Sequence, residues 1–358
     1  MKLKIGIITY SRSINYGAIL QCYALQEILC KMGYDVNVIN YKQAGEQTYG
    51  AILDRSYFKR NFKHPGNIVR YMLSFFRRLK IYIEFSKFKS DYIAYTHLCT
   101  EKTIPQNFNI YLLGSDQLWT LEYSGGIDNV FWGNFAHPKE SVICSYAISS
   151  NKESIENTET SLLKQMFSNF KKISLRESSI KLLIERKCEG IQTQIDIDPT
   201  LLADDTIWSD IIDKQWLNGN YVVTYQVARS QDQTLYQKAL ELANQIGCEV
   251  INLSTYSYSP QQFVSAIKYA KCVLTTSFHG VAFGLIFHRP LWVCVLNDGH
   301  DSRYVDLLTE IGASSFLHNL DEQPKIIDAD YSKIEEALKK KRISSLSYLQ
   351  SLKSLIQV

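Results

Sequence analysis

The chain alternates between short apolar strands and amphipathic helices, and this alternation restricts its fold more than any other feature. Residues 4–10 (KIGIITY) are predicted to form a strand, residues 18–33 a helix and residues 34–41 a second strand. Apolar side chains recur every three or four positions from Ala18 to Met32, as on one face of a helix. Strand–helix–strand units of this kind predict a parallel sheet with helices on its faces.

The alternation starts again at residue 218 and continues to residue 296. Because 358 residues exceed the roughly 100 to 200 residues typical of one domain, two domains are expected. We predict an α/β fold of two Rossmann-like domains, residues 1–175 and 176–330, facing a cleft and followed by a helix over residues 331–358. This organisation resembles the B-type glycosyltransferase fold.

The last predicted helix carries an apolar stripe and a basic run. Leu346, Leu349, Leu352 and Leu355 lie on a spacing of three, which drifts slowly around a helix but still gives one apolar stripe. We expect this stripe to pack on protein. The basic run at residues 339–342 is more typical of a solvated face than of a membrane contact.

Several function classes are disfavoured by what the sequence lacks. The first strand–helix loop has no G-x-G-x-x-G, which argues against a nicotinamide cofactor, and a net charge of +3 gives no reason to expect a nucleic-acid partner. The eight cysteines include no C-x-x-C pair and fit a reduced cytosol, and the first apolar run is too short for a signal sequence. The pair Asp196 and Asp198 has the spacing of a metal-binding D-x-D, but Pro199 follows it and favours a structural turn. No tightly bound metal is predicted.

A basic segment interrupts the first domain at about residues 55–90. Residues 55–89 hold ten Lys or Arg and one acid, Glu84, among aromatic and aliphatic side chains. One interpretation is a solvated helical insertion whose long cations cover apolar neighbours. The other is a basic amphipathic surface that rests on an anionic membrane, so the predicted location is cytoplasmic, with peripheral contact at the inner membrane face left open.

Polar residues follow several buried strands and are therefore expected at one edge of a parallel sheet. They include Asp116 after residues 109–115, Arg176 and Glu177 after a short strand, and His279 in the stretch LTTSFHGVAFGLIF (274–287). In that stretch a strand leads directly into an apolar helix. The amides that open a helix attract anions, so His279 lies where an anionic substrate would be met.

Six strings in order resemble the polysaccharide pyruvyl transferase family. They are RSINYGAILQCYALQ, GSDQLW, ICSYAISS, SLRE, DPTLL and TTSFHGVAFGLIFHRPLWV, the last followed by DSRYVDLL, and they span about residues 12–312. The resemblance implies transfer of a carboxyethylidene (pyruvyl ketal) group from phosphoenolpyruvate to two hydroxyls of a sugar in a surface polysaccharide. It implies no cofactor beyond this donor, and a sugar or lipid-linked oligosaccharide as acceptor.

Phosphoenolpyruvate carries a phosphate and a carboxylate, and the planar fork of arginine matches either anion. The candidates on the side of the second domain are Arg176 and Arg303, Ser277 with the backbone amides of residues 278–280 (Phe278, His279 and Gly280), and the His279 imidazole as anion ligand or proton donor. For Arg176 the alternative is a structural salt bridge with Glu177 or Asp198. For His279 it is a structural hydrogen bond.

The acceptor is assigned to the first domain. Asp116 is the candidate general base for the acceptor hydroxyl, and its alternative role is to cap its own loop. The other candidates for the acceptor side are Asn15, Tyr16, Gly17, Gln21, Ser115 and Gln117. Two rival functions stay open: a nucleotide-sugar-dependent glycosyltransferase of the same architecture, and a non-catalytic glycan-binding protein.

Overall fold

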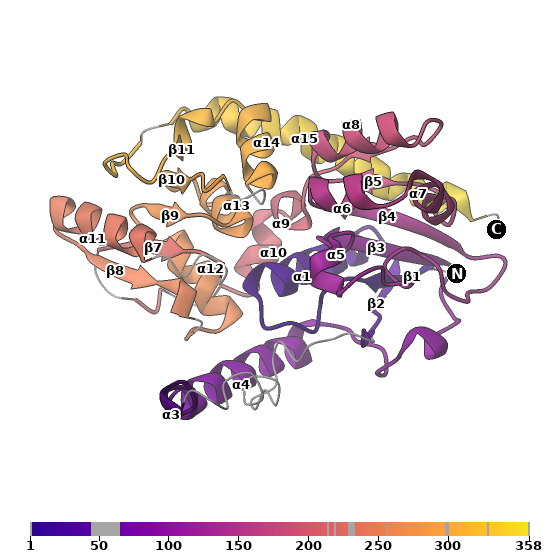
Figure 1. The fold of residues 1–358 in the computed structure, drawn as a ribbon, viewed down its shortest axis with the longest axis horizontal. Helices are drawn as coiled ribbons and strands as arrows, with labels where there is room; N and C mark the ends of the chain where they lie inside the picture. Colours follow the sequence, from indigo (N-terminus) through magenta and orange to yellow (C-terminus); the bar gives the residue numbers. More distant parts are fainter. Residues whose placement is uncertain are drawn as a thin grey trace.

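Two parallel β-sheets lie side by side in the computed structural model of the chain (Figure 1). The structure describes residues 2–43, 65–212, 215–217, 220–227, 233–255, 257–297, 301–327 and 329–356. The sheets contain six and five strands within these ranges. This arrangement confirms the predicted α/β fold class with two parallel sheets.

The first sheet has the strand order β2-β1-β3-β4-β5-β6, and every neighbouring pair is parallel. Its strands are β1 (Lys4–Ile8), β2 (Asp35–Val38), β3 (Ile110–Asp116), β4 (Val142–Ile148), β5 (Ser174–Leu175) and β6 (Gln194–Ile195). Its helices are α1 (Tyr16–Lys31), α5 (Leu121–Ser124), α6 (Lys152–Asn157), α7 (Thr160–Phe167) and α8 (Ser178–Lys187). The central strands are almost continuously buried, as is typical of parallel sheets covered on both faces.

The second sheet has the order β11-β10-β9-β7-β8 and is again parallel. Its strands are β7 (Tyr221–Tyr225), β8 (Glu249–Asn252), β9 (Val273–Thr275), β10 (Leu291–Cys294) and β11 (Leu317–His318). The helices between them are α11 (Thr234–Ile246), α12 (Pro260–Lys268), α13 (Phe278–Ile286) and α14 (Ser302–Glu310). The restart seen in the sequence is therefore the start of the second sheet.

The predicted boundary between residues 175 and 176 falls inside the first sheet. The strand β6 pairs with β5, so α8 and β6 still belong to the first sheet. The chain then passes through two short helices, α9 (Pro199–Leu202) and α10 (Asp205–Ser209), before β7 begins. The strands β5 and β6 are two residues long each, which is too short for a periodic pattern to reveal them.

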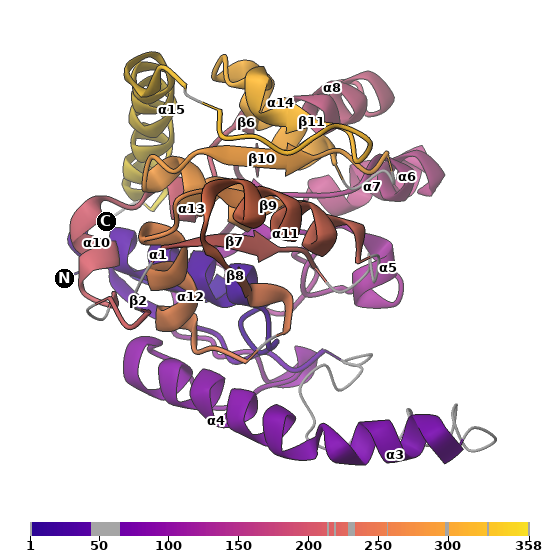
Figure 2. The same ribbon diagram turned by 90° about the vertical axis from the view of Figure 1, so that its left-hand side faces the viewer.

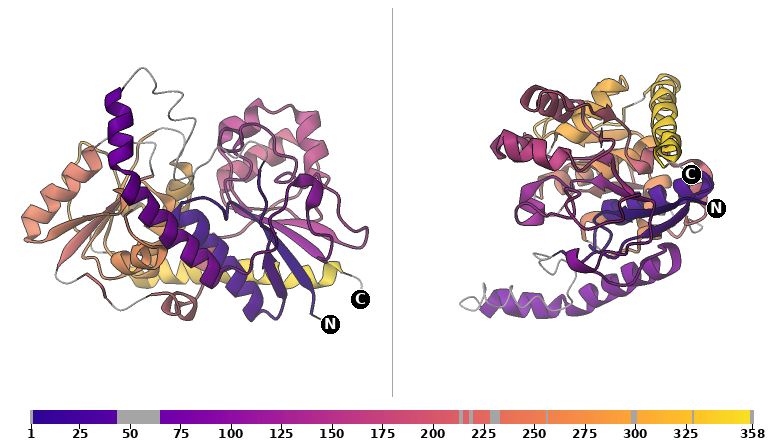
Figure 3. Two further views of the ribbon diagram at one scale, coloured as in Figure 1. Left: turned by 90° about the horizontal axis from the view of Figure 1, so that it is seen from below. Right: turned by 90° about the vertical axis from the view of Figure 1, so that its right-hand side faces the viewer.

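The long helix α15 (Tyr331–Ser351) and the turn η4 (Leu352–Leu355) return from the second sheet to the first (Figure 3). The Tyr34 hydroxyl donates to the carbonyl of Leu349 (2.8 Å), and the Tyr348 hydroxyl donates to the carbonyl of Ser145 (2.6 Å). The side chains of Leu349 and Leu352 are fully buried. The prediction that this helix packs on protein is confirmed.

Helices α3 (Pro65–Leu73) and α4 (Phe75–Tyr92) form an arm along one side of the molecule, and α3 extends beyond the body (Figure 2). The predicted basic insertion is thus helical from residue 65 onward, while its first part, residues 55–64, lies outside the described residues. No helix within the described ranges is both long and apolar enough to cross a bilayer.

Candidate functional site

The register of the first sheet brings three polar strand ends to one edge. Asp116 pairs with Ile148 at the end of β4, and Ile148 pairs with Leu175 at the end of β5. Arg176 follows Leu175 directly, and its amide donates to the carbonyl of Ile148 (3.0 Å). Asp116 and Arg176 therefore leave the same edge of the sheet on either side of the end of β4, as the sequence predicts for the carboxyl ends of parallel strands.

Arg176 is the centre of this group, and its side chain is only 3% exposed. Its Nη1 lies 2.9 Å from Oδ2 of Asp198, its Nη2 lies 3.9 Å from Oδ1 of Asp116, and its Nε lies 3.8 Å from Oε1 of Glu177. Its Cζ lies 4.8 Å from the ring centroid of Phe278. The ion pair with Asp198 that the sequence offered as an alternative is present, and anion binding by Arg176 stays a prediction.

His279 reaches the same group from the second sheet. It is the second residue of α13, and its Nε2 lies 3.9 Å from Oδ2 of Asp198. Burial lowers the pKa of His279, opposed by the carboxylates of Asp198 and Asp116. The imidazole packs against the start of α1, because a Cβ built on Gly17 would lie 2.0 Å from Nδ1 of the ring. Gly17 is therefore the residue that lets the two halves of the site meet.

Asp198 caps a helix and also pairs with the buried cation of Arg176. Its Oδ1 accepts from the Thr200 amide (2.9 Å) and the Thr200 hydroxyl (2.7 Å), so it caps the start of α9. Burial disfavours its charge, but Arg176, His279 and the Thr200 hydrogen bonds outweigh this effect and lower the pKa of Asp198. The interpretation of residues 196–198 as a structural turn is confirmed for Asp198. No cluster of three or more potential metal ligands was found in the described ranges.

Glu177 is a buried acid that sequence reasoning treated only as a possible salt-bridge partner. Its Oε1 accepts from the Ser149 hydroxyl (2.7 Å). Burial raises the pKa of Glu177 to about 7, although Arg176, Ser149 and Arg303 act to lower it. A carboxyl group with a pKa near neutrality is suited to proton transfer. Its position directly after Arg176 at a strand end is the sequence feature that indicates a place in the site.

Several buried polar atoms of this group lack a hydrogen-bond partner in the described part of the chain. They are the three guanidinium nitrogens of Arg176, Nε of Arg303, Nε2 of His279 and Oε2 of Glu177. Arg303 is the second residue of α14, and its charge acts on both Glu177 and His279. Buried polar groups are normally hydrogen-bonded, so these nitrogens are unusual, although Arg176 is ion-paired with Asp198 at 2.9 Å.

The start of α13 adds backbone donors to the same place. Ser277 is the N-cap of this helix, but its side chain makes no capping hydrogen bond. The first amides of α13 thus have no side-chain cap, and they open beside His279. Gly280 has a packing reason as well, because a Cβ at this position would lie 2.2 Å from Oγ1 of Thr275. Ser277 and Phe278 are both buried.

The residues predicted for the acceptor side divide into two groups. Ser115 and Asp116 adjoin the ionic group: the Ser115 hydroxyl donates to the Ala147 carbonyl (2.7 Å) and lies 3.3 Å from Oδ2 of Asp198. Asp116 has a φ of 83°, a conformation that is uncommon outside glycine and is found preferentially at functional sites. Its Oδ1 accepts from the amide of Gln117 (2.8 Å), as its loop-capping role predicts, and it also faces Arg176.

The other acceptor candidates have internal roles. The Asn15 side chain caps α1 by accepting from the Ala18 amide (3.2 Å). Gln21 is fully buried and donates to the Thr9 hydroxyl (2.9 Å). Tyr16 is also fully buried.

Tyr16 joins the two halves of the protein. Its hydroxyl donates to the carbonyl of Tyr258 (2.8 Å), and its ring stacks on Phe263 at 4.3 Å between centroids. Both partners belong to the second half. Tyr16 and Gln21 are fully buried and make these internal contacts, and their assignment to the acceptor side stays a prediction.

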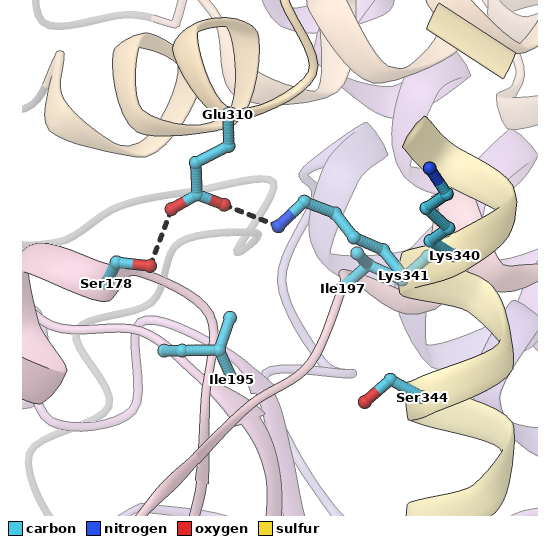
Figure 4. Close-up of a pocket in the computed structure, with 7 residues that line it drawn as sticks. All are labelled: Ser178, Ile195, Ile197, Glu310, Lys340, Lys341 and Ser344. Carbon is cyan, nitrogen blue, oxygen red and sulfur yellow. Dashed lines mark hydrogen bonds and ion pairs between the residues drawn. The ribbon is translucent and has the colours of Figure 1, made fainter. Parts of the chain in front are cut away.

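A separate cavity of about 500 Å³ lies between α8, α14 and α15 (Figure 4). Glu310 accepts from the Ser178 hydroxyl (2.5 Å) and from Nζ of Lys341 (2.5 Å) across it. Lys340, on its rim, pairs with Glu336 (2.8 Å). Its charges are already matched, and none of the ionic group around Arg176 lines it.

Comparison with known proteins identifies a family for this chain. A family model described as polysaccharide pyruvyl transferase matches residues 15–298. No curated protein matches the chain. Solved structures with a similar course of the chain include the glycosyltransferase SnogD from Streptomyces nogalater (10% identity, 100% of both chains covered, TM-score 0.47). They also include a UDP-GlcNAc 2-epimerase from Methanocaldococcus jannaschii (12% identity, 95% of this chain and 92% of that chain covered, TM-score 0.42).

Proposed function

Because the chain belongs to the polysaccharide pyruvyl transferase family, we propose that it transfers the carboxyethylidene group of phosphoenolpyruvate to two hydroxyls of one sugar. The observation that carries this proposal is the group of buried guanidinium and imidazole nitrogens of Arg176, Arg303 and His279 that have no hydrogen-bond partner within the described ranges. A donor with both a carboxylate and a phosphate would satisfy them, together with the amides that open α13. The acceptor is a sugar or lipid-linked oligosaccharide that offers two neighbouring hydroxyls.

The proposed reaction has two stages. One sugar hydroxyl adds to carbon-2 of the enol phosphate and loses its proton, and the methylene carbon takes up a proton to become a methyl group. The bond between carbon-2 and the phosphate oxygen then breaks, and the second hydroxyl adds to carbon-2 and loses its proton. The products are the ketal and inorganic phosphate, so atoms and charge balance without a cofactor.

The buried residues have roles that fit these steps. Arg176, Arg303 and the α13 amides hold the anions and stabilise the departing phosphate. Asp116 accepts the proton of an attacking hydroxyl, and His279 binds or protonates the phosphate. We assign protonation of the methylene carbon to Glu177, which lies directly after Arg176 and whose pKa of about 7 leaves it partly protonated at neutral pH.

The test is release of inorganic phosphate from phosphoenolpyruvate in the presence of a panel of sugars and lipid-linked oligosaccharides. Phosphoenolpyruvate should also raise the melting temperature, because it binds the folded state. Uridine and guanosine diphosphates are the controls for the rival glycosyltransferase function. If these nucleotides raise the melting temperature while phosphoenolpyruvate has no effect, the proposal fails.

A further inference from the structure

The base of the α3–α4 arm is fixed beside the loop that leads into α1. One face of α4 is buried through Ile81, Phe85 and Phe88. The Phe85 ring lies 5.2 Å from that of Tyr16, centroid to centroid. Nζ of Lys89 donates to the carbonyl of Arg12 (2.6 Å), in the loop before α1. The C-terminal half of α4 therefore lies close to α1, the helix whose first residues contact His279.

The outer face of the arm exposes large apolar side chains. Phe76, Lys80, Ile83 and Lys87 follow one another at spacings of three and four, so they form one stripe along α4. All four are exposed, Phe76 to 79% and Ile83 to 54%. Val69, Met72 and Leu73 add exposed apolar surface on α3, which continues the line of α4 (Figure 2). The interpretation as a solvated helix requires long cations to cover these apolar side chains. They are exposed instead, which disfavours that interpretation.

The charges on this surface are predominantly positive. Arg77, Lys80 and Lys87 are exposed, whereas Glu84 is half-buried at the edge of the stripe and Asp91 lies at its base. Arg78 has a different role, because its guanidinium lies 3.5 Å from the centroid of the Tyr71 ring and donates to the Tyr71 carbonyl (2.7 Å). It ties α3 to α4.

We propose that this arm docks the protein on an anionic lipid bilayer. Phe76 and Ile83, with the apolar residues of α3, enter the headgroup region, while Lys80 and Lys87 meet the anionic headgroups. An amphipathic helix with large apolar side chains and interleaved lysines is the pattern of interfacial helices. A second copy of the chain fits less well, because two such stripes would bring four lysines together with only the half-buried Glu84 of each copy beside them. This inference is independent of the proposed reaction.

The test is co-sedimentation of the full chain with vesicles of phosphatidylcholine alone and of equimolar phosphatidylglycerol and phosphatidylcholine, at low and high salt. We expect binding to the anionic vesicles at low salt and loss of binding as salt rises. Lys80→Glu/Lys87→Glu should weaken binding by roughly 25-fold or more. Phe76→Ser/Ile83→Ser should weaken it as well, although the charge is unchanged.

Matched controls change the same residue types elsewhere on the surface. Lys102→Glu/Lys139→Glu alters net charge equally at exposed sites, and Leu182→Ser/Ile343→Ser removes two apolar side chains exposed to 68% and 59%. Both controls should bind more tightly than their arm counterparts. Failure of the unmodified protein to bind anionic vesicles at low salt overturns the proposal. If sedimentation velocity then shows a dimer that Phe76→Ser/Ile83→Ser dissociates, the stripe is an interface between copies instead.

Discussion

Substitution of Gly17 by alanine tests the contact on which the candidate site depends. The added Cβ would lie 2.0 Å from Nδ1 of His279, whereas ordinary Cβ contacts begin near 3.4 Å, so the imidazole must move by about 1.4 Å or more. A misplacement of roughly 1 Å in a catalytic site can cost about 100-fold in rate. Overpacking of this kind costs roughly 1–3 kcal/mol in stability, offset in part by the better helix propensity of alanine. We expect phosphate release to fall by about 100-fold.

A control variant and a double variant separate the clash with His279 from other effects of the substitution. Gly66→Ala, on α3, places a Cβ in open space and should leave the rate unchanged without lowering stability. In the background of His279→Ala the obstacle to a Cβ at position 17 is absent, so Gly17→Ala should there be nearly neutral for stability. Urea unfolding and phosphate release measure the two quantities. A Gly17→Ala variant with wild-type rate, or the same stability loss in both backgrounds, would refute the reasoning.

Three other predictions concern the ionic group. Arg176→Lys keeps a cation beside Asp198 but loses the planar guanidinium. The rate of phosphate release should fall by roughly 100-fold, while the free energy of unfolding changes little. An unchanged rate would show that Arg176 does not bind the anion. Arg176→Ala leaves Asp198 buried without this cation and should cost roughly 3–5 kcal/mol in urea unfolding, so a small loss would contradict the ion pair. Burial raises the pKa of Glu177 from its ordinary 4.5 to about 7, so the folded protein binds this proton more tightly than the unfolded chain. The free energy of unfolding that this proton contributes is complete below pH 4.5 and is lost as the pH rises through 7. The loss amounts to about 3 kcal/mol. Glu177→Gln should flatten this part of the pH profile, and an identical profile would count against the raised pKa.

The sequence predicted the features that depend on local patterns. Helix α1 and strands β1 and β2 follow from an uninterrupted periodicity, and Arg176 was placed at the sheet edge because it follows a strand. The position of His279 at the start of α13 was predicted for the same reason. These predictions need only the geometry of a parallel sheet and the direction of its strands.

The features that the sequence missed depend on contacts between distant segments. Nothing near Gly17 indicates that a histidine more than 250 positions away lies against it, and only the packed structure shows why glycine is needed there. Tyr16 carries a hydroxyl at the start of a helix, which suits a sugar-binding residue and an interdomain contact equally well, and only the structure shows that its ring stacks on Phe263 of the second half. The domain boundary was misplaced because β6 is too short to be recognised before its partner β5 is known.

The return of α15 to the first sheet determines how the two halves can move. The polypeptide passes between them twice, once near α9 and once along α15, so the second half is tethered at two points. A body held at two points cannot swing freely, and the rotation that strains neither tether is a hinge about the line joining them. The Tyr16–Tyr258 hydrogen bond and the Gly17–His279 contact both join the two halves. A rotation of one half about this hinge would break both contacts at the same time.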